Sequence, residues 1–116
     1  MKLNDPHLVK PSTQSAVLLI FFMSRGSANL QGRVLLSTLA DSLQRQFGSL
    51  LRVIRVDDAT HPDVVHSFDI TQTPAFVLVR QGIELWRQVG MSDEAKLVLQ
   101  IRQLLTTELT KSQSII

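Results

Sequence analysis

The stretch SAVLLIFFMSRGSAN, residues 15–29, decides the fold class of this chain. Its first part, Ser15 to Met23, is a continuous run of apolar, β-branched and aromatic side chains, which is typical of a strand buried on both faces of a parallel sheet. A short polar loop follows, and an amphipathic segment begins directly after it. In α/β proteins the loop between the carboxyl end of a strand and the next helix is a favoured place for binding and catalysis. The stretch therefore predicts a buried strand, a helix and a candidate functional loop between them.

The composition is that of one globular domain without cysteine. The chain has 116 residues, 44% of them hydrophobic, and it contains no Cys. A chain of this length buries a core without covalent staples. The missing cysteines exclude disulfides, thiolate metal sites and thiol redox chemistry, and they leave the redox compartment undecided.

The high isoelectric point, about 9.5, does not indicate a nucleic-acid partner. The net charge is only +2, and without Tyr or Cys a small excess of Lys and Arg moves the isoelectric point far up. The eight arginines are scattered along the chain, and aromatic residues make up only 5%. Nucleic-acid binders need a basic stripe with stacking aromatics. We therefore expect no nucleic-acid partner.

The apolar run of residues 15–23 does not have the features of a targeting or membrane segment. The residues before it include Asp5 and two prolines, with only Lys2 and Lys10 as positive charges, which does not fit a signal peptide. The run is also much shorter than the ~20 residues that span a bilayer. The sequence therefore predicts a strand, no membrane association and a cytoplasmic location.

The first half of the chain continues with a long helix and a second strand. Residues 1–14 are polar and contain two prolines, so we expect an extended lead-in. The helix is expected from Asn29 or Leu30 to Phe47, followed by a helix-terminating Gly48. Its buried stripe is expected to comprise Val34, Leu35, Leu39, Leu43 and Phe47. Leu51 to Val56 then reads as a strand.

The second half predicts a short helix, a hairpin and a final helix. Thr60 is expected to cap the short helix, in which Pro62 occupies the first turn. Strands 75–79 and 83–89 are expected to be joined by a tight turn at Gln81-Gly82. Ser92 is expected to cap the last helix, whose buried stripe comprises Leu97, Ile101, Leu104 and Leu105. We expect the domain to span residues 15–109 and a flexible tail to occupy 110–116.

These elements give the order β-α-β-α-β-β-α and an α/β fold. Two strands joined by a crossover helix should be parallel, whereas the hairpin is antiparallel. The sequence therefore predicts a four-stranded mixed sheet flanked by helices. The apolar density of the first two strands places both at the centre of this sheet.

Four short motifs at this spacing resemble the thioredoxin family. They are Val56-Asp57 at the end of the second strand, Thr73-Pro74-Ala75-Phe76 at the start of the third, and Gln81-Gly82 and Val89-Gly90 around the hairpin. The resemblance covers residues 15–108 and implies a thioredoxin-like fold. It also implies a cis peptide bond before Pro74, because the family has its cis-proline there.

The resemblance breaks at the residues that carry the family's chemistry. The redox motif Trp-Cys-Gly-Pro-Cys would fall on Arg25-Gly26-Ser27-Ala28-Asn29, which holds neither cysteine. The family's buried Asp corresponds to Ile20 and its facing Lys to Val53. Thiol–disulfide exchange needs an attacking thiolate. A redox-inactive thioredoxin-like protein is therefore implied.

The function that the resemblance leaves is binding of a protein or an extended peptide, in a chaperone-like or adaptor-like role. In the family, the loop before the long helix and the residue before the cis-proline hold a peptide as an added strand. The corresponding binding residues here are Ser24, Arg25, Gly26, Ser27, Ala28, Asn29, Thr73, Pro74 and Gly90. We expect no cofactor and no metal, and the oligomeric state stays open.

Two alternatives place other functions in the same loop. A non-thiol enzyme would need Ser24 or Ser27 beside His61 or His66, but the loop lacks a Gly-x-Ser-x-Gly elbow, and a helix cap explains Ser27 more simply. An anion site would use Arg25 and the helix N-terminus. A third possibility is a protein that shares only its fold with the disulfide oxidoreductases.

The histidines and acids near the short helix favour an ordinary structural interpretation, whereas the role of Trp86 stays open. The five-residue spacing of His61 and His66 does not put both on one helical face, so we expect the nearby acids Asp57, Asp58 and Asp63 to be surface residues, not metal ligands. Trp86, the single Trp, either packs under the last helix or contacts a partner.

Overall fold

The computed structural model describes residues 16–22 and 30–114 of the chain, and side chains within residues 16–22 and 31–106. It contains three α-helices, one 3₁₀ turn and four strands in these residues. In chain order they are β1 (Ala16–Phe22), α2 (Leu30–Phe47), η1 (Gly48–Leu50), β2 (Leu51–Asp57), α3 (Pro62–Ser67), β3 (Ala75–Arg80), β4 (Ile83–Val89) and α4 (Glu94–Ser114). The fold is an α/β fold, as the sequence predicts.

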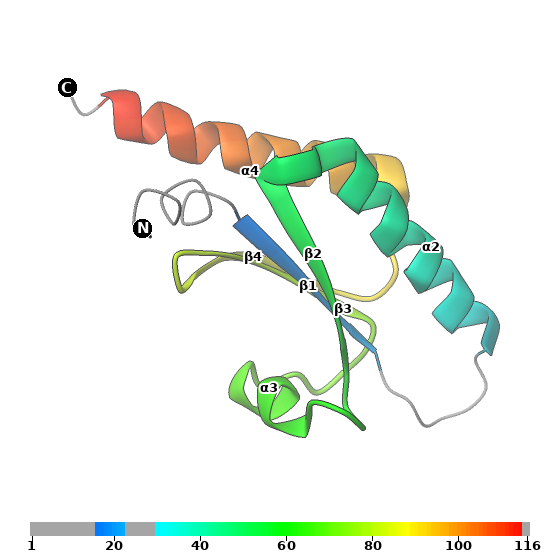
Figure 1. Cartoon of the computed structure of the whole chain (residues 1–116). Coiled ribbons are helices and arrows are strands. Elements are labelled where there is room, and N and C mark those ends of the chain that lie inside the picture. Colours follow the sequence, from blue (N-terminus) through cyan, green and yellow to red (C-terminus); the bar gives the residue numbers. More distant parts are fainter. Residues whose placement is uncertain (1–15, 23–29, 115–116) are drawn as a thin grey trace, which may run out of the picture.

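The four strands form one mixed sheet in the order β2-β1-β3-β4. β1 is parallel to β2, with Leu18 opposite Val53, and antiparallel to β3, with Leu18 opposite Leu78. β3 and β4 are an antiparallel hairpin with an irregularity between Leu78 and Val79. Figure 1 shows β1 running through the middle of the molecule, with α3 at one end.

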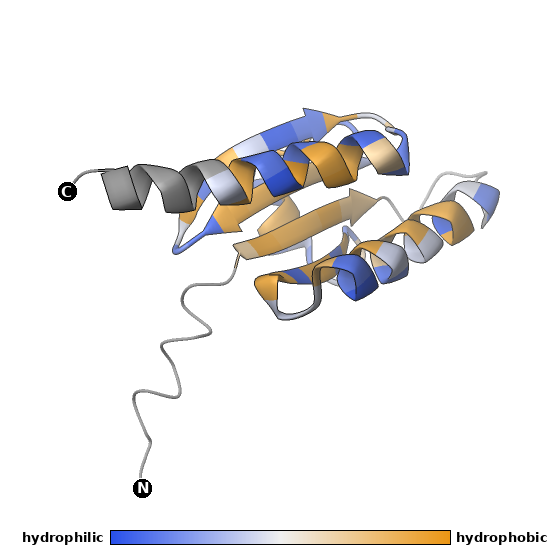
Figure 2. Cartoon of the chain, turned by 90° about the horizontal axis from the view of Figure 1, so that it is seen from above, coloured by the Kyte–Doolittle hydropathy of each residue, from blue (hydrophilic) through white to orange (hydrophobic). Residues whose placement is uncertain are grey.

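The helices cover the two faces of the sheet unequally. α2 and α4 lie on one face, where their buried residues share one core with the sheet, and Figure 2 shows the two helices on either side of β1. The short helix α3 packs on the other face, where the ring of Phe68 lies 5.7 Å from that of Phe21. The apolar core therefore has two parts, a larger one under α2 and α4 and a smaller one under α3. Trp86 is half-buried against the larger part.

One strand is not where the sequence analysis placed it. β1 is central and has its alternate residues buried in the two cores, but β2 is an edge strand of the described sheet, so its predicted central position is wrong. Arg52 and Arg55 of β2 are exposed. Charged side chains are a common feature of edge strands, because they discourage pairing with another chain. Apolar density alone overestimated the burial of β2.

The side chain of Gln44 in α2 pairs with the backbone of β2 in the manner of a neighbouring strand. Its Nε2 donates to the C=O of Leu51 over 2.8 Å and to that of Gly48 over 3.1 Å, and its Oε1 accepts the N–H of Val53 over 2.9 Å. Backbone groups at a sheet edge need partners. Gln44 therefore satisfies part of the β2 edge and fixes the end of α2 against it.

The buried stripe of α2 is turned relative to the prediction. It comprises Leu36, Leu39, Ala40, Leu43 and Phe47. Val34 and Leu35, which we expected in the stripe, are exposed. The i, i+3, i+4, i+7 spacing from Leu36 gives one continuous face, and packing on the sheet selects that face over the neighbouring one.

The helix ends also differ from the predictions. α3 begins after His61, and Thr60 does not cap it, since its hydroxyl contacts His61 Nδ1 at 2.9 Å and the C=O of Asp57. α4 begins at Glu94, so Asp93 and not Ser92 directly precedes it, and the N–H of Leu97 donates to the C=O of Asp93. α4 continues to Ser114, beyond the domain end that we drew at residue 109. In the described part of the chain, no helix has the length and hydrophobicity needed to cross a membrane.

The hairpin turn matches its prediction. Gln81 and Gly82 both have positive φ, 53° and 78°. A two-residue turn of this kind has the twist that a hairpin requires, and a Gly at its second position avoids steric strain.

Candidate functional site

The candidate site lies at the end of the sheet where β1, β2 and β4 end and β3 begins. Thr73 and Pro74 immediately precede β3, and Gly90 immediately follows β4. The N–H of Gly90 donates to the C=O of Pro74 over 2.7 Å. The φ of Gly90 is +98°, which other residues rarely adopt, so a Gly is needed at this position. The Thr73–Pro74 peptide bond is cis.

Only part of the predicted site can be placed. Thr73 and Pro74 lie beside Gly90, and their role in binding stays a prediction. Ser24, Arg25, Gly26, Ser27, Ala28 and Asn29 lie outside the described residues. Their part in the site, and the alternatives that depend on Ser24, Ser27 or Arg25, therefore stay predictions.

Thr73 has a backbone with unused hydrogen-bonding capacity. The ladder between β1 and β3 starts with Phe21 opposite Ala75, so Thr73 is beyond its end. Within the described part of the chain, the backbone N–H and C=O of Thr73 form no hydrogen bond. The residue is half-buried. Backbone groups in such a position need water or an incoming polar group as partner.

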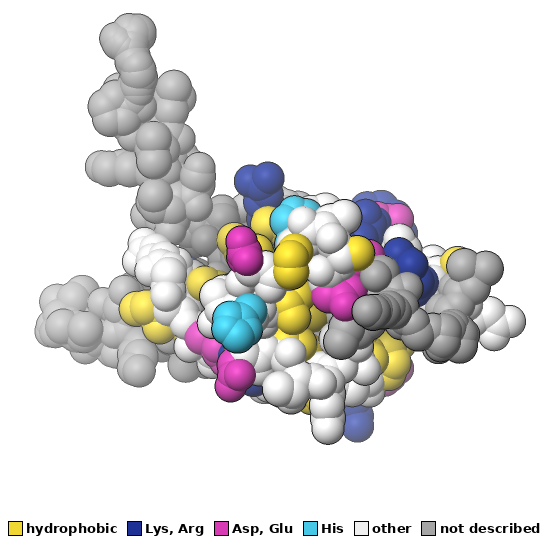
Figure 3. All heavy atoms as spheres, turned by 90° about the horizontal axis from the view of Figure 1, so that it is seen from below, with side chains coloured by type: hydrophobic (Ala, Val, Ile, Leu, Met, Phe, Trp, Pro, Cys, Tyr) yellow, Lys and Arg dark blue, Asp and Glu magenta, His cyan; other side chains and the backbone are white. Residues whose placement is uncertain are grey.

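Exposed apolar side chains gather at the same end of the molecule. Seven large hydrophobic side chains are exposed among the described residues, and four of them belong to this end: Val34 and Leu35 in the first turns of α2, and Val89 and Met91 on either side of Gly90. Figure 3, a view from below, shows hydrophobic side chains at the surface near the two histidines, on the side of the molecule where α3 lies. Exposed apolar groups that gather in this way are a common feature of interaction sites.

Arg33 is a residue of this end that the sequence analysis did not identify. It comes from the first turn of α2, and its guanidinium carbon lies 5.4 Å from the centre of the Phe22 ring. Its Nη2 is 3.5 Å from Oδ2 of Asp57, whose Oδ1 accepts the N–H of Ala59 over 2.9 Å. Arg33 thus connects α2 with the carboxyl ends of both parallel strands. No local pattern predicts this contact, because 24 residues separate the two partners.

The positions of the family's buried acid and base are apolar here. Ile20 is fully buried in the larger core, and Val53 packs partly buried against the same core. Neither position can donate or accept a proton. The described residues at this end therefore contain no acid–base pair of the kind that supports thiol chemistry.

Of the histidines and acids near α3, Asp63 is exposed, whereas Asp57 and Asp58 are half-buried. His61 and His66 are both exposed. Among the described residues, no three His, Asp or Glu side chains form a group that could hold a metal ion. Asp57 is engaged by Arg33 and Ala59, and Asp63 lies in the first turn of α3.

Arg87 fixes α3 against the sheet beside this end. Its Nη2 donates to the C=O of Phe68, just after α3, over 3.0 Å, and its Nε and Nη2 donate to the carboxylate of Glu84 over 2.7 and 2.8 Å. These hydrogen bonds hold the pKa of Glu84 below its usual value and raise that of Arg87. Both side chains are about one-third exposed, so solvent screens the pair.

Comparison with solved structures identifies the fold. A malaria parasite thioredoxin-2 superposes with a TM-score of 0.67 at 21% identity, covering 77% of this chain and 82% of its own. A thioredoxin of Fasciola hepatica gives 0.66 at 20% identity, with 84% and 88% covered. The germline-specific thioredoxin Deadhead of Drosophila melanogaster gives 0.68 at 20% identity, with 84% and 89% covered.

No family model matches the sequence, and no curated protein matches it either. Identities near one in five show the fold alone and do not carry an activity across. The chain has the thioredoxin fold, and it has no cysteine with which to perform thiol–disulfide exchange.

Proposed function

We propose that this chain is a redox-inactive protein of thioredoxin fold that binds an extended segment of a partner protein. The binding site is the end of the sheet at which Thr73, Pro74 and Gly90 lie. The observation that carries this proposal is the backbone of Thr73 next to β3, whose N–H and C=O form no hydrogen bond with the described residues. A peptide backbone in extended conformation supplies the complementary N–H and C=O groups. This mode of binding needs no thiol.

The surroundings of Thr73 support an apolar ligand segment. Val89 and Met91 are 50% and 52% exposed and lie on either side of Gly90, whose N–H is bonded to Pro74. In strand addition the main chain supplies affinity, while alternate side chains enter neighbouring pockets or contact apolar surface. We therefore expect ligands with hydrophobic side chains at alternate positions. A cytoplasmic location is part of the proposal.

Selection of peptides on the whole protein tests this function. A phage-displayed library of random linear peptides is selected on the wild type, and the affinity of the best peptide is measured by calorimetry. Val89→Glu and Met91→Glu should weaken binding by about tenfold or more, because a charge enters the apolar contact. Leu50→Glu is the matched control, since Leu50 is 61% exposed in η1, at the far end of α2.

A second peptide separates main-chain pairing from hydrophobic contact. In this peptide, single backbone nitrogens of the selected sequence are methylated, which removes one hydrogen-bond donor at a time. Methylation at every second position should lower the affinity for the protein, because every second residue of a strand points its N–H towards the same neighbour. The proposal fails if no peptide is enriched, if Leu50→Glu weakens binding as much as Val89→Glu, or if N-methylation has no effect.

A further inference from the structure

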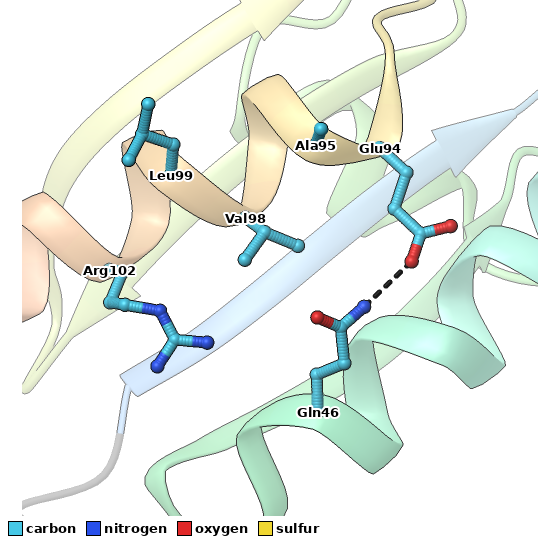
Figure 4. A pocket seen from close by; sticks show the side chains of 6 residues that line it. All are labelled: Gln46, Glu94, Ala95, Val98, Leu99 and Arg102. Atoms are coloured by element: carbon cyan, nitrogen blue, oxygen red, sulfur yellow. Dashed lines mark hydrogen bonds between the residues drawn. The ribbon is translucent and has the colours of Figure 1, made fainter.

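A cleft lies between α2 and α4, on the face of the sheet opposite α3. It has a volume of about 580 Å³, opens widely to solvent and is lined by Gln46, Glu94, Ala95, Val98, Leu99 and Arg102. Figure 4 shows the side chains of Val98, Arg102 and Glu94 directed from α4 into the space towards α2, with Leu99 on the outer side of α4. The cleft takes no part in the candidate site described above.

One end of the cleft is closed by a polar network. Oε2 of Glu94 accepts hydrogen bonds from Oγ of Ser42 and from Nε2 of Gln46, each over 2.6 Å. Gln46 Nε2 also lies 3.3 Å from the Ser42 hydroxyl. The network joins the start of α4 to the second half of α2, so the two helices have a fixed separation at this point. Glu94 is engaged within the protein.

α4 carries a second apolar stripe besides the one that packs on the sheet. Leu97 and Ile101 are buried in the larger core. Ala95, Val98, Leu99 and Arg102 follow the spacing i, i+3, i+4, i+7, so they form a separate row on α4, with Val98 and Arg102 directed into the cleft and Leu99 at its outer rim. Leu99 is 59% exposed, and Val98 is half-buried. This row is the pattern that one helix presents to another helix.

Arg102 places an oriented positive charge at the other end of this row. Its guanidinium carbon lies 5.1 Å from the centre of the Phe47 ring, which holds the group over an apolar surface. Among the described side chains, which end at residue 106, no carboxylate lies within ion-pair distance of Arg102. A guanidinium fixed in this way forms strong, directional hydrogen bonds with a carboxylate.

We propose that this cleft binds an amphipathic α-helix of a partner protein, with apolar side chains on Val98 and Leu99 and an acidic side chain on Arg102. The charge of Arg102 and the apolar row on α4 select such a helix by complementarity. A small molecule fits less well, because ligand pockets usually bury most of their ligand's surface and this cleft is open. The surface is independent of the peptide site proposed at Thr73.

A synthetic helix tests the proposal on the whole protein. The probe is an amphipathic peptide of about sixteen residues, long enough to form a helix, with leucines spaced i, i+3, i+4, i+7 and one Glu beside the last leucine. In a second probe this Glu is replaced by Lys. Binding is measured by calorimetry and by ¹⁵N chemical-shift mapping. We expect the Glu probe to bind more tightly and to shift the amides around Val98, Leu99 and Arg102.

Three variants assign the binding to these residues. Leu99→Ser should weaken the Glu probe by about tenfold. Arg102→Glu should weaken the Glu probe by about tenfold and should reverse the preference in favour of the Lys probe. Ile83→Ser is the matched control, because Ile83 is 64% exposed at the far end of the hairpin, and it should leave binding unchanged.

Four results would overturn the proposal. They are no binding of either probe at about 1 mM, equal binding of both, shifts confined to residues outside the cleft, and self-association of the free protein that Leu99→Ser abolishes. The last result would assign the cleft to a second copy of the chain.

Discussion

Replacing Ile20 by Asp places a carboxyl group at the position that corresponds to the buried Asp of the thioredoxin family. Ile20 is fully buried in the larger core, whose members are all apolar, and it lies on the central strand β1. Burial disfavours the charged form of a carboxyl group, so the pKa of the new Asp should be raised. We expect Ile20→Asp to destabilise the protein, and to do so more strongly at pH 7 than at pH 4.

The magnitude follows from two contributions. Loss of the buried Ile side chain costs about 2–5 kcal/mol at any pH. If burial raises the pKa by about three units above 3.9, the charged state costs a further ~4 kcal/mol at pH 7. Because the folded pKa is the higher one, this second cost is absent below the unfolded pKa and grows by about 1.4 kcal/mol per pH unit until the folded pKa is reached. The sum is comparable to the ~5–15 kcal/mol that stabilise a typical domain.

Urea unfolding at a series of pH values between 4 and 7 measures both contributions. Trp86, half-buried against the same core, reports the loss of packing by fluorescence, and far-UV circular dichroism reports the helices. Ile20→Asn is the matched control, because it has nearly the same shape and no titrating group. A difference between the Asp and Asn variants that does not change with pH would refute the reasoning, since it would mean that position 20 is not in a low-dielectric core.

Three further predictions address other parts of the molecule. Gln44→Ala should lower the free energy of unfolding in urea by about 1–3 kcal/mol, because it removes the hydrogen-bond partner of the β2 edge. The exposed edge should also promote self-association, measured by sedimentation, and no change in either quantity would show that water replaces the amide. Arg87 lowers the pKa of Glu84, so the ion pair stabilises the folded state only while Glu84 is charged. As the pH falls from about 4.5 through the lowered pKa, the free energy of unfolding of the wild type should decrease by a few tenths of a kcal/mol relative to that of Glu84→Gln, and equal pH profiles of the two would contradict this. In an insulin-reduction assay with dithiothreitol the protein should not exceed the uncatalysed rate, because it contains no thiol; acceleration would show a different chemistry.

The sequence alone determined the elements and the missing chemistry. Apolar runs, periodicity and turn residues predicted all four strands and the three helices, with small errors at their ends, because these patterns act over a few neighbouring residues. The Gln81-Gly82 turn was predictable for the same reason. The absence of thiol chemistry needs no structure, since a chain without cysteine cannot form a thiolate.

The sequence was less informative where an outcome depends on packing. Val34 and Leu35 fit a helical stripe as well as Leu36 and Ala40 do, and only the contact with the sheet selects between the two faces. Likewise, the apolar residues of β2 do not reveal whether its outer edge is covered by another strand or by a side chain such as Gln44.

The tertiary structure alone decided which distant residues meet. It brought Arg33 to Asp57 and Phe22, and it formed the cleft between α2 and α4 with Arg102 at its end. None of these contacts has a local signature, because each joins side chains or backbone groups from separate elements. Their geometry follows from the crossover of the chain and from the packing of helices on a twisted sheet.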